Sequence, residues 1–268
     1  MRIFIVLVWL AGAGSATAVA QGVPLPKPPP PAWNVPHTFG EAVGPDFNSS
    51  EVTSAPTECD GRLDKIAAFE LMPRLVGPGA CGGGDMVRLD AVLRPGGGRI
   101  EFKPAPVLRC AFAESVAEWL RAEAGPRIDK MGSALKTVET DDDFECRGRN
   151  RVAGAKVSEH GKGNAVDLHS FVLADGRSLG LTDVAVAKQL REELRDSACR
   201  HFTTVLGPGS DGYHEAHIHL DLIERRQGFR MCQWDVREPA QAEVATTVPL
   251  PVPRPAEPHR AVNQNRKM

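Results

Sequence analysis

Apolar residues recur at helical spacing in two stretches of the chain. In the first stretch, four residues fall at i, i+4, i+7 and i+8 and so share one helix face: Phe112, Val116, Trp119 and Leu120. In the second, Thr182 or Asp183 is placed to cap a helix. The buried face of that helix would carry Ala187, Leu190, Leu194 and Ala198. We interpret both apolar faces as parts of a core.

Shorter apolar runs, bounded by glycine or polar residues, predict β-strands. These runs cover residues 87–93, 100–102, 135–138, 165–172 and 216–223. Two helices mixed with short strands and glycine-rich turns are typical of an α+β fold. We therefore expect a small antiparallel sheet flanked by helices.

The two ends of the chain differ in composition from its middle. Residues 1–20 combine Arg2, an apolar run and small residues up to Ala20, which is the pattern of a secretory signal peptide. The alternative for this segment is a membrane anchor that is never cut, but its apolar run is too short to span a bilayer comfortably. We expect cleavage after Ala20 and no membrane span in the mature protein.

Proline-rich stretches flank the middle of the chain. Residues 21–36 hold seven prolines in sixteen positions, and a second stretch extends from Pro239 to Pro258. Such segments favour extended polyproline II and cannot bury a core. The predicted organisation is a signal peptide at 1–20, a disordered linker at 21–57, one domain at 58–236 and a disordered tail at 237–268.

Charge and cysteine usage narrow the class of protein. The chain has 32 basic and 34 acidic residues and a net charge of −2. It therefore has no strong positive electrostatic field that would attract nucleic acid. Its cysteines are even in number and form no Cys-x-x-Cys pair: Cys59, Cys81, Cys110, Cys146, Cys199 and Cys232. Six cysteines in an oxidising compartment predict up to three disulfides, with 15 possible pairings. We expect a periplasmic or otherwise extracytoplasmic protein.

Two histidine-containing clusters, at 158–167 and 214–221, carry the candidate chemistry. In the second cluster apolar residues alternate with polar ones, so His217 and His219 point to the same face of a strand. Zinc prefers imidazole nitrogen together with a carboxylate or a third imidazole. A neighbouring strand could add His160 and Asp167 to His219 around one ion. The small residues between them, Gly161, Gly163 and Ala165, would let the backbone pass close to the metal.

These residues resemble a known signature. The pattern is Ser158-x-His160-x-x-Gly163-x-Ala165-x-Asp167, followed by His217-x-His219. It resembles the zinc peptidases that include the D-Ala-D-Ala carboxypeptidases, the lysostaphin-type endopeptidases and the hedgehog signalling domain. More narrowly, residues 55–236 resemble the bacterial extensin-like C-terminal domain family. That resemblance lies in the cysteine frame and in the segments GACGGGDMVRL, FECRGRNR, SEHGKGNAVDLHSF, HFTTVLGPGSDGYHEAHIHLDL and CQWD.

The wider resemblance implies a role for each matched residue. It makes His160, Asp167 and His219 the ligands of one Zn²⁺ per chain. His217 would act beside the metal as a general base or a stabiliser of the oxyanion, and His214 as an additional active-site histidine. Ser158 would orient its neighbours without attacking the substrate.

Two further positions bear on the branch of the superfamily. The carboxypeptidase branch has a catalytic Glu where this chain has Ala216, and Glu215 is the nearest acid. This departure favours a histidine-based endopeptidase. Arg149 or Arg151 could bind substrate, as an arginine does in that branch, although each also fits an exposed residue on a solvated loop.

The expected function is an exported zinc-dependent peptidase that hydrolyses an amide bond in the cross-link or stem peptides of peptidoglycan. Two alternatives from other classes remain open. One is a catalytically inactive, zinc-stabilised cell-wall-binding module. The other is a structural wall protein in which the proline-rich arms carry the function.

Overall fold

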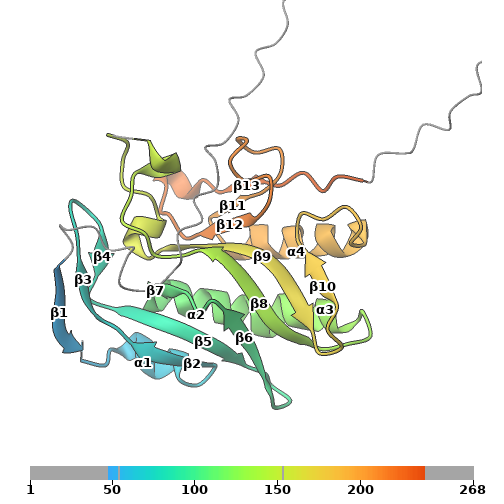
Figure 1. Cartoon of the computed structure of the whole chain (residues 1–268), viewed down its shortest axis with the longest axis horizontal. Coiled ribbons are helices and arrows are strands. Elements are labelled where there is room, and N and C mark those ends of the chain that lie inside the picture. The colour runs from blue at the N-terminus through green and yellow to red at the C-terminus, as the bar shows by residue number, and fades with distance from the viewer. Residues whose placement is uncertain (1–47, 54, 153, 239–268) are drawn as a thin grey trace, which may run out of the picture.

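The computed structural model describes residues 48–53, 55–152 and 154–238 (Figure 1). The predicted signal peptide, most of the linker and the tail from residue 239 lie outside the described residues. Part of the predicted linker is described: it contains strand β1 (Asn48–Thr53), which pairs antiparallel with β3 (Pro73–Val76). With β4 (Gly82–Gly83) these strands form a small three-stranded sheet beside the main one.

The main sheet has ten strands and is mixed. Its order is β13 (Met231–Gln233), β11 (Thr204–Leu206), β12 (Ile218–Asp221), β9 (Ala165–Leu173), β8 (Leu135–Asp142), β6 (Arg99–Lys103), β5 (Met86–Leu93) and β2 (Ala67–Leu71). In addition, β10 (Ser178–Gly180) pairs with β9, and β7 (Val107–Arg109) pairs with β5. The expectation of a small antiparallel sheet was wrong in size and in strand direction. The pairs β6–β8 and β11–β13 are parallel, and β6 reaches β8 only through a helical crossover, which parallel pairing requires.

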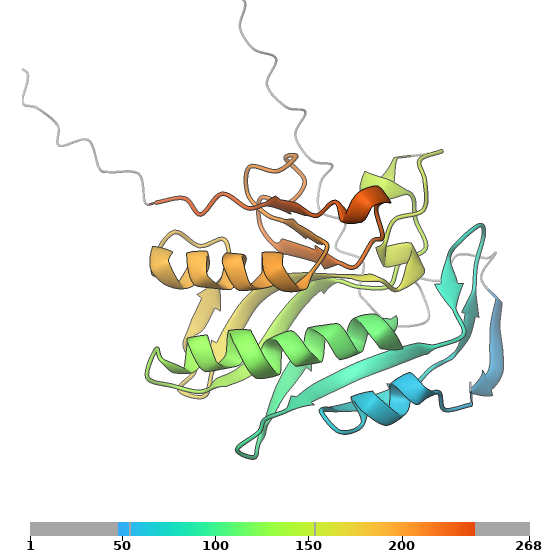
Figure 2. The same ribbon diagram turned by 180° about the vertical axis from the view of Figure 1, so that it is seen from behind.

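Helices cover one face of this sheet (Figure 2). The crossover consists of α2 (Cys110–Trp119), a π-helical turn η1 (Leu120–Ala124) and α3 (Gly125–Asp129). This confirms the helix predicted around residues 112–120 and extends it. Its apolar face enters the core, where the Trp119 ring lies 6.4 Å from that of Phe171 on β9 and 5.6 Å from that of Phe202.

The second predicted helix exists, but its predicted start was wrong. Helix α4 (Lys188–His201) buries Leu190, Leu194 and Ala198 as expected. The Asp183 side chain instead accepts a hydrogen bond from the Ala185 backbone N–H at 2.8 Å and closes a turn. Ala187 is consequently exposed, and the helix begins one residue after it.

All five predicted strands occur, with shifted ends. β8 continues to Asp142, four residues beyond its predicted end, and β12 is shorter than the predicted 216–223. The strands that the pattern missed are mostly two to five residues long, too short to display alternation. The short helix α1 (Glu58–Leu63), capped by Thr57, was also missed.

Three disulfides join elements that are distant in sequence. Cys59 in α1 pairs with Cys110 in α2, Cys81 with Cys146, and Cys199 in α4 with Cys232 in β13. No cysteine of the described chain is free, which confirms the prediction of three bridges and is consistent with an extracellular protein. Among the described residues, no helix has both the length and the apolar character needed to cross a bilayer.

Removal of the α1–α2 bridge should lower the free energy of unfolding. The paired substitution Cys59→Ser and Cys110→Ser opens a loop with a sequence separation of 51 residues. The loss of loop-closure entropy predicts a cost of about 4 kcal/mol. Urea denaturation of the variant and of the unreduced parent measures the difference. Unchanged midpoints would contradict a structural role for this bridge.

Candidate metal centre

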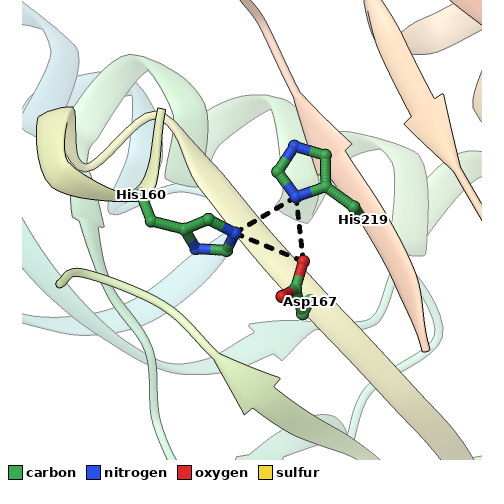
Figure 3. Close-up of side chains that lie close together, drawn as sticks. All are labelled: His160, Asp167 and His219. Carbon is green, nitrogen blue, oxygen red and sulfur yellow. Dashed lines mark hydrogen bonds and ion pairs between the residues drawn. The ribbon is translucent and has the colours of Figure 1, made fainter. Parts of the chain in front are cut away.

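Two adjacent strands bring the predicted ligands together. β12 pairs antiparallel with β9, and in this register His219 lies directly opposite Asp167. The alternating residues Val166, Leu168, Ile218 and Leu220 belong to the hydrophobic core under the helices. Asp167 and His219 therefore project from the other face of the sheet (Figure 3). This confirms the strand periodicity on which the prediction rested, although His217 lies just before β12.

A tight turn immediately before β9 presents the third residue. His160 begins the single 3₁₀ turn η3 (His160–Lys162), which ends at Gly163 in the left-handed region at φ +66°. The buried Glu159 carboxylate accepts hydrogen bonds from the side chains of Lys162 and Asn164 and thereby braces the turn. A Cβ atom at residue 163 would lie 2.5 Å from Met86 Cε. Glycine is therefore favoured there by backbone conformation and by the packing of Met86, and its expected role beside a metal stays a prediction.

Three acceptor atoms meet at one buried point (Figure 3). His160 Nε2 lies 3.1 Å from His219 Nδ1 and 3.3 Å from Asp167 Oδ1, and the latter two atoms lie 2.9 Å apart. In a tetrahedral zinc site with bonds near 2.05 Å, neighbouring ligand atoms are about 3.3 Å apart. The donor set and its spacing therefore fit a small divalent ion with little adjustment.

The outer nitrogen of each imidazole is already occupied. His160 Nδ1 donates a hydrogen bond to the Asp143 carbonyl oxygen at 2.8 Å, which leaves its Nε2 lone pair facing the centre. His219 Nε2 donates to the buried Asp221 carboxylate at 3.1 Å, which orients Nδ1 inward. Outer partners of this kind fix the tautomer of metal-binding histidines.

Electrostatics at the cluster favour a positive charge at its centre. Burial alone would raise the pKa of Asp167, but His160 and His219 hold it well below its usual range. Burial alone would lower the pKa of His219, whereas hydrogen bonds to Asp167 and Asp221 raise it to about 9. In the metal-free protein a proton on His219 Nδ1 thus faces the two remaining acceptors, His160 Nε2 and Asp167 Oδ1. A bound cation has to displace that proton.

Two further histidines lie beside the cluster. His217 Nε2 is 3.3 Å from Asp167 Oδ2, the carboxylate oxygen that faces away from the other two ligand atoms. The His214 ring centroid lies 5.2 Å from that of His217 and 5.4 Å from that of His219. His214 Nδ1 donates to Asp211 at 2.7 Å. Burial is the main cause of the lowered pKa of His214, which favours its neutral form.

The remaining predicted residues have defined contacts. Ser158 is buried, and its Oγ accepts a hydrogen bond from the His160 backbone N–H at 3.3 Å. Arg151 pairs with Glu145 and Asp142, so its charge is already partnered, while Arg149 is exposed. Their predicted role in binding substrate stays a prediction. Glu215 accepts from the Gly209 backbone N–H and pairs with Arg237.

Three contributions escaped the sequence analysis. Asp221 alternates with His217 and His219, which places it on their face, but its hydrogen bond to His219 was not predicted. Asp211 lies three residues before His214 in a Gly-Ser-Asp-Gly turn, a spacing that has no alternation or motif to expose it. The Asp143 carbonyl is a backbone group, which every residue type has, so the sequence pattern could not indicate its role.

Comparison with known proteins identifies the family of the chain. No curated protein and no solved structure matches it. Residues 57–233 match the family described as extensin-like protein C-terminus, a range that contains all the residues of the cluster and all six cysteines. The chain therefore belongs to the extensin-like C-terminus family.

Proposed function

We propose that this protein is a zinc-dependent peptidase that hydrolyses an amide bond in the cross-link or stem peptides of peptidoglycan. The observation that carries the proposal is the convergence of His160 Nε2, Asp167 Oδ1 and His219 Nδ1 within 3.3 Å of one another. Three protein ligands leave one tetrahedral position for water or substrate, which is the arrangement of catalytic zinc sites.

Zinc held by these three residues would supply a Lewis acid for a peptide carbonyl and would lower the pKa of bound water to about 7. The chain's own part is to position groups and to handle protons. His217 is 20% exposed in its side chain, so it is open to substrate while its Nε2 contacts Asp167. An imidazole in that place can accept a proton during attack at the ring nitrogen that does not face Asp167 and return it to the leaving amine.

His214 is suited to a second supporting role. Because Nδ1 donates to Asp211, the lone pair of neutral His214 is on Nε2, the nitrogen not engaged by Asp211. The ring contacts both His217 and His219, so it also limits the orientations open to them. We assign it an auxiliary function as a hydrogen-bond acceptor beside the substrate.

The substrate class is supported by chemistry and by resemblance. Three disulfides suit an exported protein, and amide bonds of wall peptides are accessible in such a compartment. The residue pattern resembles zinc peptidases of that class. Glu215, the nearest acid to the position of the carboxypeptidase Glu, is engaged by Gly209 and Arg237, which favours the histidine-based endopeptidase.

Zinc content and turnover should separate the two histidines of the His-x-His pair. His219→Ala removes a ligand, so bound zinc should fall well below one per chain, as it should in His160→Ala and Asp167→Ala. His217→Ala should retain zinc but lose about 10²-fold or more in turnover, the usual scale for a positioned acid–base group. Metal analysis and mass spectrometry of purified muropeptides after incubation measure the two quantities.

Each other outcome has a definite meaning. Zinc retained by all four variants would place the metal elsewhere and remove the peptidase proposal. Zinc lost from His217→Ala but kept by His219→Ala would reverse the assignment of the pair. One zinc per parent chain with no cleavage of any muropeptide would support the inactive wall-binding module, and no bound zinc would support the structural wall protein.

The two outer carboxylates provide a matched test of which histidine is a ligand. Asp221→Asn should weaken zinc binding about tenfold or more, because Asp221 supports a ligand. Asp211→Asn should leave zinc affinity unchanged, because Asp211 supports His214, which is not a ligand. Titration against a chromogenic chelator measures both affinities. Equal losses in the two variants would contradict this division.

A further inference from the structure

A short segment that follows β13 lies against the loop that carries His214. Residues 234–238 follow β13, and the match ends at residue 233. The segment leaves β13 beside the loop 207–217 that connects β11 to β12 (Figure 1). Two backbone hydrogen bonds join them: Gly207 N–H donates to the Gln233 carbonyl, and Asp235 N–H donates to the Pro208 carbonyl, each at 2.8 Å.

Side-chain packing fixes the base of the loop to this segment. Trp234 is 5% exposed and lies in the main core. A Cβ atom on Gly207 would lie 2.9 Å from the Trp234 ring and 2.7 Å from Ile218 Cδ1, so the glycine allows the indole to approach the backbone. The indole Nε1 is buried without a hydrogen-bond partner among the described residues. Trp234 therefore acts here through its shape.

The next turn of the loop is equally close. Gly209 adopts φ +84°, and a Cβ atom there would lie 2.2 Å from Asp235 Oδ2. Any larger residue would separate the loop from the segment or strain the backbone. Further along the loop, Glu215 pairs with Arg237 at 2.9 Å. The contacts thus reach both sides of Asp211 and His214.

A buried arginine holds the segment from the other side. Arg191 in α4 is 1% exposed, and its guanidinium donates to the carbonyl oxygens of Val186 at 3.0 Å and of Arg237 at 2.7 Å. No carboxylate forms a salt bridge with Arg191 within the described part of the chain. A buried cation that binds main-chain carbonyls fixes the path of the backbone rather than neutralising a charge.

We propose that residues 234–238 form a strap that positions the loop 207–217, and with it the Asp211–His214 pair, beside the metal centre. Trp234 and Arg237 are positioning residues that act through Gly207 and Glu215. The meaning of His214 for catalysis rests on the proposed function, whereas the positioning of the loop does not. None of the three zinc-ligand candidates lies in this loop, so the strap should affect the loop without affecting zinc content.

The test uses full-length variants and two readouts. Trp234→Ala should raise amide hydrogen exchange in residues 208–216 by about tenfold or more, because a local packing contact is lost. It should also change the ring ¹⁵N signals of His214, which report its tautomer. Trp234→Phe removes the unpartnered N–H and part of the ring volume but keeps an aromatic side chain in the core, so its exchange should rise less than that of Trp234→Ala. Zinc content should stay at the parent value.

Controls separate positioning from general destabilisation. Ile128→Ala deletes a fully buried side chain in α3, away from the loop, and should leave both readouts unchanged. Arg88→Ala in β5 removes only the exposed pairs with Glu70 and Asp90, which involve no residue of the segment, and should be neutral. If Trp234→Ala does not fold, Arg237→Gln provides the same test, with a smaller expected rise in loop hydrogen exchange of about threefold. Arg237→Lys keeps the positive charge and should return the exchange to the parent rate.

Two results would overturn the strap. One is unchanged loop exchange and unchanged His214 signals in a folded Trp234→Ala or Arg237→Gln variant. The other is an equal response in Ile128→Ala. A parent protein that binds no zinc would count against the proposed function alone. The strap would still be testable, because the exchange measurement needs neither metal nor substrate.

Discussion

Three acceptor atoms that face one another in a buried place repel unless a positive charge lies between them. His160 Nε2, Asp167 Oδ1 and His219 Nδ1 are in this situation. A proton on His219 meets the requirement in the metal-free protein, which is why the pKa of that residue rises to about 9 against the effect of burial. A divalent ion would meet it with more charge and would free the proton. Much of the surrounding architecture keeps these three atoms at that spacing.

Several separate features of the fold hold the three ligand atoms at this spacing. The β9–β12 register fixes Asp167 opposite His219, and core residues on the other face of the same strands prevent a slip by one residue. The segment that follows β8 supplies the Asp143 carbonyl, which orients His160. The Cys81–Cys146 disulfide anchors that segment three residues later. The Cys81–Cys146 disulfide therefore stabilises the fold and also helps to orient His160.

The residues that converge in the candidate site were easier to predict from the sequence than the topology of the sheet. His160, Asp167 and His219 were predictable because strand alternation and the spacing of rare residue types are local signals. The ten-stranded mixed sheet was not predictable, because strands such as β11 and β13 have three residues each and their pairing is decided by tertiary contacts. The start of α4 was misjudged because Asp183 caps a turn as readily as a helix. Asp211 was missed because its relation to His214 exists only in the folded loop.

The number of converging atoms bears on whether the centre is structural or catalytic. A structural zinc site closes its tetrahedron with a fourth protein ligand. In the described chain only three His, Cys or acidic residues converge. His217, the nearest further candidate, contacts the other oxygen of Asp167 and is partly open to solvent. A third histidine that lies beside the ligands without joining them, with a fourth held by Asp211, is costly to bury if the metal only stabilises the fold. This arrangement supports the proposed catalytic centre over the inactive wall-binding module.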